Sequence, residues 1–185
     1  MKIRTFICIE LPDSIKTKLG EIQTEMKTLG SNVRWTRTDG IHLTLKFLGN
    51  VEKQNINQIV EQIAEASRVH SPVEIEVKES GAFPDFKKPR VFWIGVHDPS
   101  GALARLQMTI DTKLEKIGFE KENRRFSPHL TIGRVKSHDG LNATSRALEE
   151  MSIEPMAFLA NQVVVMQSHL QLKGAVYTPL HIIKL

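Results

Sequence analysis

The tetrapeptide HLTL at residues 42–45 occurs a second time, with one conservative change, as HLTI at residues 129–132. Residues i and i+2 of a β-strand project from the same face, about 6.6–6.8 Å apart. Each copy therefore places a histidine and a threonine on one face of a strand and two aliphatic side chains on the other. Such a tetrapeptide arises by chance in roughly one chain in a hundred of this length, and two copies far more rarely. The repeat predicts two strands of related design.

Segments around these strands have apolar residues spaced three and four apart, which is typical of amphipathic helices. We predict helices over residues 12–29, 54–69, 100–117 and, on a weaker pattern, 139–150. Pro12 in the first turn and Gly30 beyond the end mark the boundaries of the first helix, and Gly118 follows the third. The apolar stripe of each helix must cover a sheet.

The β-rich runs are short and separated by turn residues. They lie at residues 3–10, 33–36, 42–48, 73–80, 91–96, 129–135, 162–167 and 176–184. Several alternate apolar and polar residues, which is typical of antiparallel sheets with one face under helices. Because strands and helices alternate irregularly, we expect an α+β fold of antiparallel sheets covered by helices, not a doubly wound parallel fold. No linker interrupts the chain, so residues 1–185 are expected to form one bilobal domain.

Composition narrows the classes of protein. With 185 residues, of which 41% are hydrophobic, the chain can bury the core of one domain, which excludes global disorder. No apolar stretch approaches the roughly 18 residues of a membrane helix, and the first residues are expected to form a strand rather than a secretion signal. The single cysteine, Cys8, cannot form an intramolecular disulfide, so a cytoplasmic location is expected. A net charge of +4 tolerates a polyanionic partner without requiring one.

The repeated histidines suit acid–base chemistry, because an unperturbed imidazole titrates near about 6.5. If the two lobes bring their reactive faces together, His42 and His129 converge with Thr44 and Thr131 on one cleft. A neutral histidine can activate water, a protonated one can give its proton to a leaving oxygen, and the hydroxyls can bind phosphate oxygens. This arrangement permits in-line displacement at phosphorus without a metal. Zinc is disfavoured, because neither tetrapeptide supplies a second histidine, a cysteine or a carboxylate.

Several longer phrases surround the two tetrapeptides. They are Arg34-Trp35, HLTLKFLG at 42–49, PRVFWIGV at 89–96, FSPHLTIGRV at 126–135 and Tyr177. With them, nearly the whole chain resembles the bacterial and archaeal RNA 2′,3′-cyclic phosphodiesterases, long called 2′-5′ RNA ligases, within the two-histidine phosphoesterases. The resemblance implies a fold with two pseudo-symmetric lobes of antiparallel sheet, covered by helices, around a central groove. It implies hydrolysis of a terminal 2′,3′-cyclic phosphate to a 2′-phosphomonoester, without a cofactor. It also implies that His42 is the general acid for the leaving 3′ oxygen and that His129 is the general base.

Two basic residues follow the tetrapeptides. Arg134 matches the family's basic residue five positions after the second histidine, so the resemblance implies that it binds phosphate. In a regular strand Gly133, not Arg134, shares a face with that histidine, so this role requires the strand to bend or bulge near Gly133. Lys46 has the parity of the first motif's histidine, which predicts either a solvent-facing lysine or one at the groove.

The expected partner is RNA with a 2′,3′-cyclic phosphate end, such as a tRNA fragment, or a cyclic nucleotide. We expect a monomer without a membrane partner. Residues 87–90, Lys-Lys-Pro-Arg, are the best candidate RNA-contacting loop, although they could equally be a solvated turn. Two alternatives stay open. The same site could join RNA ends through a 2′-5′ linkage, with a 5′-hydroxyl in place of water, or the chain could bind RNA without catalysis.

Overall fold

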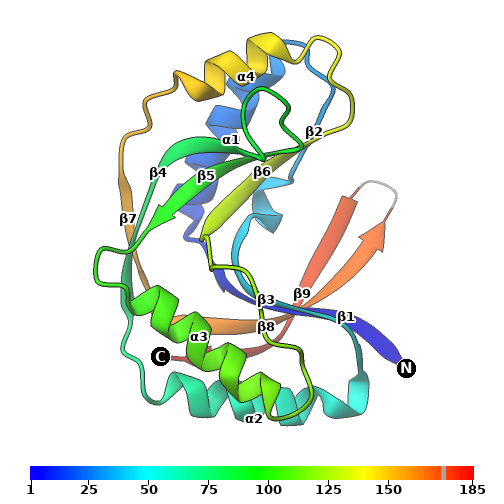
Figure 1. Cartoon of the computed structure of the whole chain (residues 1–185), viewed down its shortest axis with the longest axis vertical. Helices are drawn as coiled ribbons and strands as arrows, with labels where there is room; N and C mark the ends of the chain where they lie inside the picture. Colours follow the sequence, from blue (N-terminus) through cyan, green and yellow to red (C-terminus); the bar gives the residue numbers. More distant parts are fainter. Residues whose placement is uncertain (172–173) are drawn as a thin grey trace.

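The computed structural model describes residues 1–171 and 174–185 and contains two antiparallel sheets with helices packed on them (Figure 1). The elements, in chain order, are β1 (Lys2–Glu10), α1 (Asp13–Lys27), β2 (Val33–Trp35), the 3₁₀ turn η1 (Thr38–Gly40), β3 (His42–Glu52), the 3₁₀ turn η2 (Lys53–Asn55), α2 (Ile56–Ser67), β4 (Val73–Phe83), β5 (Val91–His97), α3 (Ala102–Glu115), β6 (His129–Val135), α4 (Asn142–Glu149), β7 (Met156–Ala160), β8 (Gln162–Gln171) and β9 (Gly174–Lys184).

The two sheets exchange strands between the halves of the chain. The four-stranded sheet has the order β3-β1-β8-β9, and the five-stranded sheet has the order β2-β6-β5-β4-β7. We name them the β3 sheet and the β6 sheet after the strands that contain the tetrapeptides. The C-terminal strands thus complete the sheet of β1 and β3, while β2 and β4 from the first half join β5 and β6. Each sheet therefore contains strands from both halves of the sequence.

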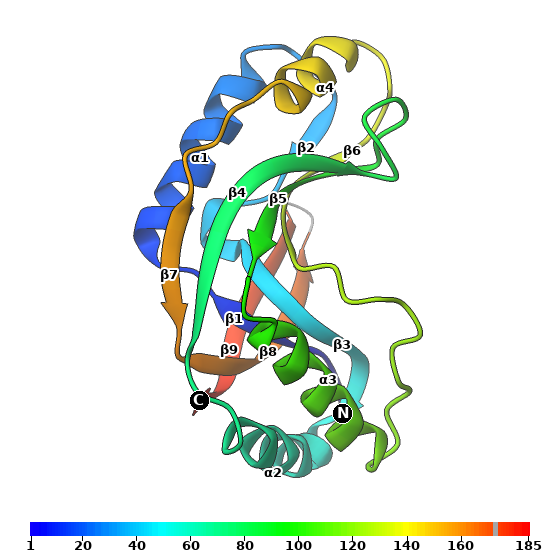
Figure 2. The same ribbon diagram turned by 60° about the vertical axis from the view of Figure 1, so that its left-hand side comes forward.

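Helices cover one side of each sheet (Figure 2). α2 and α3 pack against each other and against the β3 sheet, where α2 contacts β8 and β9 and α3 contacts β3. α1 and α4 contact each other and lie on the β6 sheet. The predicted apolar stripe of α1 is buried there, with Leu19 0% and Met26 1% exposed. We call the opposite side of each sheet, which carries the motif histidine, its site face.

One contiguous apolar core extends through both lobes. The aliphatic residues of the two tetrapeptides belong to it: Leu43, Leu45, Leu130 and Ile132 are each at most 3% exposed. Burying such a side chain stabilises the fold by roughly 1.5–3 kcal/mol. The prediction that each motif strand is anchored on one side is therefore confirmed.

The expected α+β fold with two lobes of antiparallel sheet is confirmed, and all four predicted helices form, each slightly shorter than its pattern suggested. The strand β7 was not predicted, and β8 extends beyond its predicted end at residue 167 to Gln171. Within the described residues, no helix combines the length and apolar character that crossing a membrane requires.

Candidate active site

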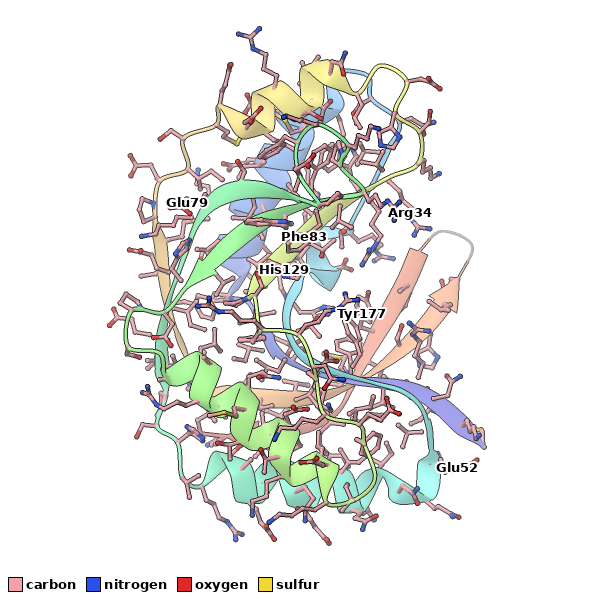
Figure 3. The ribbon with its side chains drawn as sticks, viewed as in Figure 1. Arg34, Glu52, Glu79, Phe83, His129 and Tyr177 are labelled. Atoms are coloured by element: carbon pink, nitrogen blue, oxygen red, sulfur yellow. The ribbon has the colours of Figure 1, made fainter. Side chains whose placement is uncertain are left out.

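The two tetrapeptides begin strands β3 and β6, and these two strands contact each other where the sheets meet. His42 and Thr44 are half-buried in β3, and His129 and Thr131 are half-buried in β6. Figure 3 shows His129 on the β6 sheet and Tyr177 on the β3 sheet, on facing sides of the region between the sheets. The structure thus places the four predicted motif side chains on neighbouring strands.

Both histidines are held in the same way. The Nδ1 atom of His42 lies 2.8 Å from the carbonyl oxygen of Gly40, and Nδ1 of His129 lies 2.7 Å from that of Ser127. A carbonyl can only accept a hydrogen bond, so each Nδ1 carries the proton. Each Nε2 is then the ring atom available to receive or donate a proton, as catalysis by a histidine pair requires.

Aromatic rings enclose His42. Phe6 stacks on its imidazole with ring centroids 4.6 Å apart, and Tyr177 meets it edge-on at 5.0 Å. This burial disfavours the charged imidazolium and lowers the pKa of His42 to about 4, with the positive charge of Lys16 adding a smaller effect. His42 is therefore neutral at pH 7 in the protein without substrate. The sequence pattern does not reveal Phe6, whose position opposite the motif strand depends on the pairing of β1 with β3.

A different set of rings surrounds His129. Phe83 meets its imidazole edge-on with centroids 4.9 Å apart, and Trp93 lies 6.3 Å away. Trp93 is the cross-strand partner of Thr131 and therefore lies on the site face. Trp93 lies outside the apolar core, because the alternation along β5 assigns Phe92 to the core instead.

A bulge in β6 decides where Arg134 points. β5 pairs with Gly133 and then directly with Thr131, so Ile132 has no partner on β5. This extra residue shifts the alternation, and Gly133 becomes buried while Arg134 is exposed. A Cβ atom at Gly133 would lie 2.8 Å from Val33, so only glycine fits there. The structure thus contains the bulge near Gly133 that Arg134 requires in order to share a face with His129 and Thr131.

Arg134 acts across the boundary between the two sheets. Burial raises the pKa of Tyr177 on the β3 sheet, and the positive charges of Arg134 and Arg4 oppose that rise. Arg134 is also the cross-strand partner of Arg34 on β2, so two guanidinium groups share one face of the β6 sheet. Arg4 of the β3 sheet and Arg134 of the β6 sheet thus bring positive charge near Tyr177, the ring that meets His42 edge-on.

A corresponding bulge occurs in β3. β1 pairs with Lys46 and then directly with Thr44, which leaves Leu45 without a partner. Lys46 therefore turns towards the helices, where it is 3% exposed and forms a buried ion pair with Asp111. Both alternatives expected for Lys46 were wrong, since regular alternation does not hold through the bulge. Phe47 takes the site-face position instead, 62% exposed and 6.0 Å from the Phe6 ring.

The Lys46–Asp111 pair also supports the segment that leads to His129. Lys46 Nζ donates a hydrogen bond to the carbonyl oxygen of Glu120 at 2.6 Å, and the Glu122 amide donates to Asp111 Oδ2 at 3.1 Å. These bonds fix the connection between α3 and β6 to the β3 sheet. The buried pair thus links β3 to the segment that precedes β6.

The described residues contain no group of three or more histidine, cysteine, aspartate or glutamate side chains placed to hold a metal ion. The polar groups at the site are imidazoles, hydroxyls and guanidinium groups, which can donate hydrogen bonds or a proton to an oxyanion.

Two consecutive segments, residues 9–93 and 94–177, each match the family described as LigT like Phosphoesterase. The chain belongs to the LigT-like phosphoesterase family. Each matching segment contains one of the tetrapeptides, so the family repeat coincides with the internal repeat of the sequence.

Relatives in the LigT-like family match the whole chain. An RNA 2′,3′-cyclic phosphodiesterase of Methanothermobacter thermautotrophicus is 30% identical over 186 residues, covering 100% of both chains. Another, from Archaeoglobus fulgidus, is 33% identical and covers 97% of this chain and 99% of its own. In three dimensions, TT0787 of Thermus thermophilus matches with a TM-score of 0.80 at 22% identity, covering 99% of this chain and 98% of its own. E. coli LigT complexed with 3′-AMP matches with a TM-score of 0.78 at 24% identity, covering 100% of this chain and 99% of its own. The structural matches show that the fold is shared.

Proposed function

We propose that this chain hydrolyses the 2′,3′-cyclic phosphate at the end of an RNA and leaves a 2′-phosphomonoester. The observation that carries the proposal is the pair of histidines on contacting strands, each with Nδ1 bound to a carbonyl and Nε2 available for proton transfer. Full-length relatives named RNA 2′,3′-cyclic phosphodiesterases support the choice of substrate.

The reaction is an in-line displacement at phosphorus. Nε2 of His129 takes a proton from water while the water oxygen forms a bond to phosphorus. The bond from phosphorus to O3′ breaks, and Nε2 of His42 gives its proton to O3′, which leaves as a hydroxyl. Protons balance, since one histidine gains the proton that the other loses. General acid–base catalysis of this kind contributes about 10²- to 10⁴-fold each.

The acid role requires His42 to gain a proton on binding substrate. Burial lowers its pKa to about 4 in the free protein, so at pH 7 it is neutral. A phosphate anion at Nε2 favours the imidazolium and raises the pKa. We propose that His42 takes up its proton when the cyclic phosphate binds. In the empty site His42 is therefore neutral and cannot act as the acid.

The remaining polar groups hold the phosphate. Thr44 and Thr131 lie two residues beyond the histidines, on the same faces, and their hydroxyls can donate to the non-bridging oxygens. The Arg134 guanidinium, exposed on the face of β6 that carries Thr131, can neutralise the phosphate charge. We propose no metal and no cofactor in this reaction.

The test is turnover of an oligonucleotide with a 2′,3′-cyclic phosphate end, in the presence and absence of a chelator. The wild-type protein should produce a 2′-monoester at the same rate in both conditions. His42→Ala and His129→Ala should each lower the rate by about 10²- to 10⁴-fold while substrate binding is largely kept. His138→Ala, at an exposed histidine outside the motifs, is the matched control. Full activity in either motif variant would refute the assignment, and a product joined through a 2′-5′ linkage would show ligation instead.

A further inference from the structure

Both tetrapeptides end in a bulge, and a buried glutamine binds each bulge. At these bulges the residue skipped by the neighbouring strand is Leu45 in β3, opposite β1, and Ile132 in β6, opposite β5. Each is the fourth residue of its tetrapeptide, and β3 skips a further residue, Leu48, beyond the motif. Gln23 of α1 donates a hydrogen bond to the carbonyl oxygen of Ile132 at 2.8 Å. Gln107 of α3 donates to that of Leu45 at 3.5 Å. In each half of the chain, a glutamine from a helix therefore donates a hydrogen bond to the carbonyl oxygen at the bulge.

The glutamines belong to a second internal repeat. Residues 19–26 read LGEIQTEM and residues 103–110 read LARLQMTI, which share the pattern Leu-x-x-aliphatic-Gln-x-x-aliphatic. On a helix, the aliphatic positions of this pattern and the glutamine lie on one stripe, which faces the core. Gln23 is accordingly 2% exposed and Gln107 is 7% exposed. A buried amide requires hydrogen-bond partners, and the bulges supply them.

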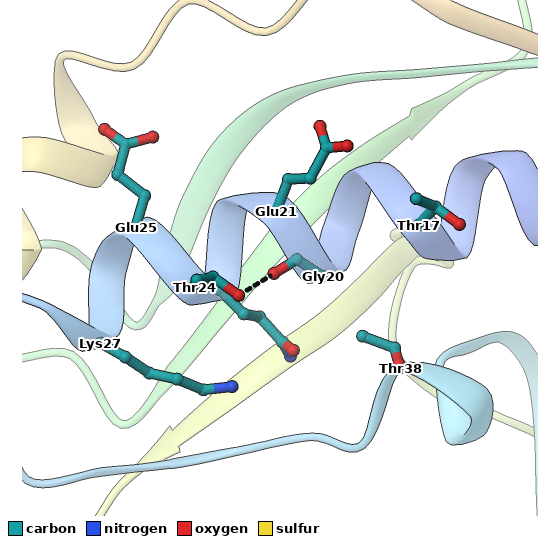
Figure 4. A pocket seen from close by; sticks show the side chains of 8 residues that line it. Thr17, Gly20, Glu21, Thr24, Glu25, Lys27 and Thr38 are labelled. Atoms are coloured by element: carbon teal, nitrogen blue, oxygen red, sulfur yellow. Dashed lines mark hydrogen bonds between the residues drawn. The ribbon is translucent and has the colours of Figure 1, made fainter.

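Gln23 makes the stronger connection. Its Nε2 atom also donates to the carbonyl oxygen of Thr36 at 2.7 Å, and the Thr36 amide donates to the carbonyl oxygen of Ile132 at 2.9 Å. The side chain thus ties together α1, the end of β2 and the bulge of β6. Near this link α1 also packs closely on η1, where a Cβ atom at Gly20 would lie 3.1 Å from Cγ2 of Thr38 (Figure 4).

The bulge has a direct consequence for the site. Without an extra residue at Ile132, the alternation of β6 would point Arg134 towards the helices and Gly133 towards the site. With it, Arg134 lies on the same face as His129 and Thr131, and its charge acts on Tyr177. The orientation of the proposed phosphate-binding arginine therefore depends on a bulge whose carbonyl Gln23 binds.

We propose that Gln23 is a positioning residue, which through its bonds to Ile132 and Thr36 keeps β6 bulged and Arg134 on the site face. Gln107 has the corresponding role in β3, where the residue brought to the site face is Phe47. The kinetic part of this inference rests on the proposed function, whereas its structural part does not.

The kinetic test is a double-mutant cycle on an oligonucleotide with a 2′,3′-cyclic phosphate end. Gln23→Met, which removes both donated bonds, should lower kcat/KM by roughly 10-fold, mainly through a higher KM. Arg134→Ala should lower it by roughly 10- to 100-fold. The double variant should be no slower than Arg134→Ala alone, because Gln23 acts through Arg134. Losses that multiply in the double variant, or wild-type kinetics in Gln23→Met, would overturn the proposal.

Two controls separate positioning from general destabilisation. Ile22→Ala, next to Gln23 on α1 and packed on the apolar core, should lower thermal stability while leaving kcat/KM within about 2-fold of wild type at a temperature where the variant is folded. Gln107→Met should reduce kcat/KM in the Arg134→Ala background as much as in the wild type. An Ile22→Ala loss equal to that of Gln23→Met, or a Gln107→Met loss that disappears without Arg134, would overturn the proposal.

A structural readout decides the inference even if the wild-type protein opens no cyclic phosphate, in which case the proposed function fails by itself. The crystal structure of Gln23→Met should show Ile132 paired with β5, or Arg134 turned away from the site face. If this variant does not fold, Gln23→Leu, which also lacks a hydrogen-bond donor, replaces it in every comparison. An unchanged β6 with Arg134 still on the site face would contradict the positioning role.

Discussion

Lowering the pH should destabilise this protein, because the buried His42 resists protonation in the folded state. The size of the effect follows from how far burial lowers the pKa of His42. Its pKa is about 4 in the folded protein, against 6.5 for an unperturbed histidine. Between these values the unfolded chain binds a proton that the folded protein does not, so stability falls as the pH falls. Above pH 6.5 both states are neutral and this difference is absent. A shift of this size corresponds to roughly 3 kcal/mol, and the partial exposure of His42 reduces it towards about 2 kcal/mol.

The measurement is urea unfolding at several pH values between 4 and 8 for the wild-type protein and His42→Asn. Asparagine keeps a donor near the position of Nδ1, so the bond to the Gly40 carbonyl can persist without a titrating group. Wild-type stability should decline relative to the variant by about 2–3 kcal/mol from pH 7 to pH 4, with a slope of at most about 1.4 kcal/mol per pH unit. His138→Asn, at an exposed position, should follow the wild type. A constant difference between wild type and His42→Asn across this range would refute the reasoning.

Three further perturbations test other parts of the site. Lys46→Met leaves the Asp111 carboxylate buried without its cation, so urea unfolding should show a loss of about 3–5 kcal/mol, and an unchanged midpoint would contradict the buried pair. Arg134→Ala should weaken binding of inorganic phosphate by roughly 10- to 100-fold in a titration, whereas unchanged affinity would place the guanidinium outside the site. Replacing Lys87 and Lys88 by alanine should reduce the salt dependence of binding to a cyclic-ended oligonucleotide, with a slope smaller by about 1.4, and leave a cyclic mononucleotide unaffected. Equal effects on both ligands would exclude these lysines from contact with the RNA chain.

The local patterns of the sequence predict much of the fold. Strand alternation correctly assigns Leu43 and Leu130 to the core and the motif histidines to the opposite face. Helical spacing locates α1, α2 and α3 because each buries a regular apolar stripe, whereas α4 buries Thr144 and Ser145 beside Leu148 and has a weaker pattern. The short strand β7, Met156–Ala160, escapes prediction because its five residues are all apolar and so show no alternation in the sequence, although their exposure alternates up to the buried Ala160.

The features that the sequence does not predict depend on pairing between distant segments. Regular alternation places Lys46 on the site face and Arg134 in the core, and one unpaired residue in each strand reverses both assignments. Such a bulge can be recognised only from the register against the neighbouring strand. The aromatic setting of His42 has the same origin, since Phe6 comes from β1 and Tyr177 from β9. The glycine after the second motif is the one local signal that the strand is irregular there.

The central claim is that His42 and His129 act together on one phosphodiester, and the rate of the double variant tests this most directly. When two groups act as a unit in one chemical step, removing either one already removes most of the rate enhancement of the pair. The double variant His42→Ala/His129→Ala should therefore turn over a cyclic-ended oligonucleotide only slightly more slowly than either single variant. Losses that multiply in the double variant would show that the two imidazoles contribute independently and would contradict a shared site.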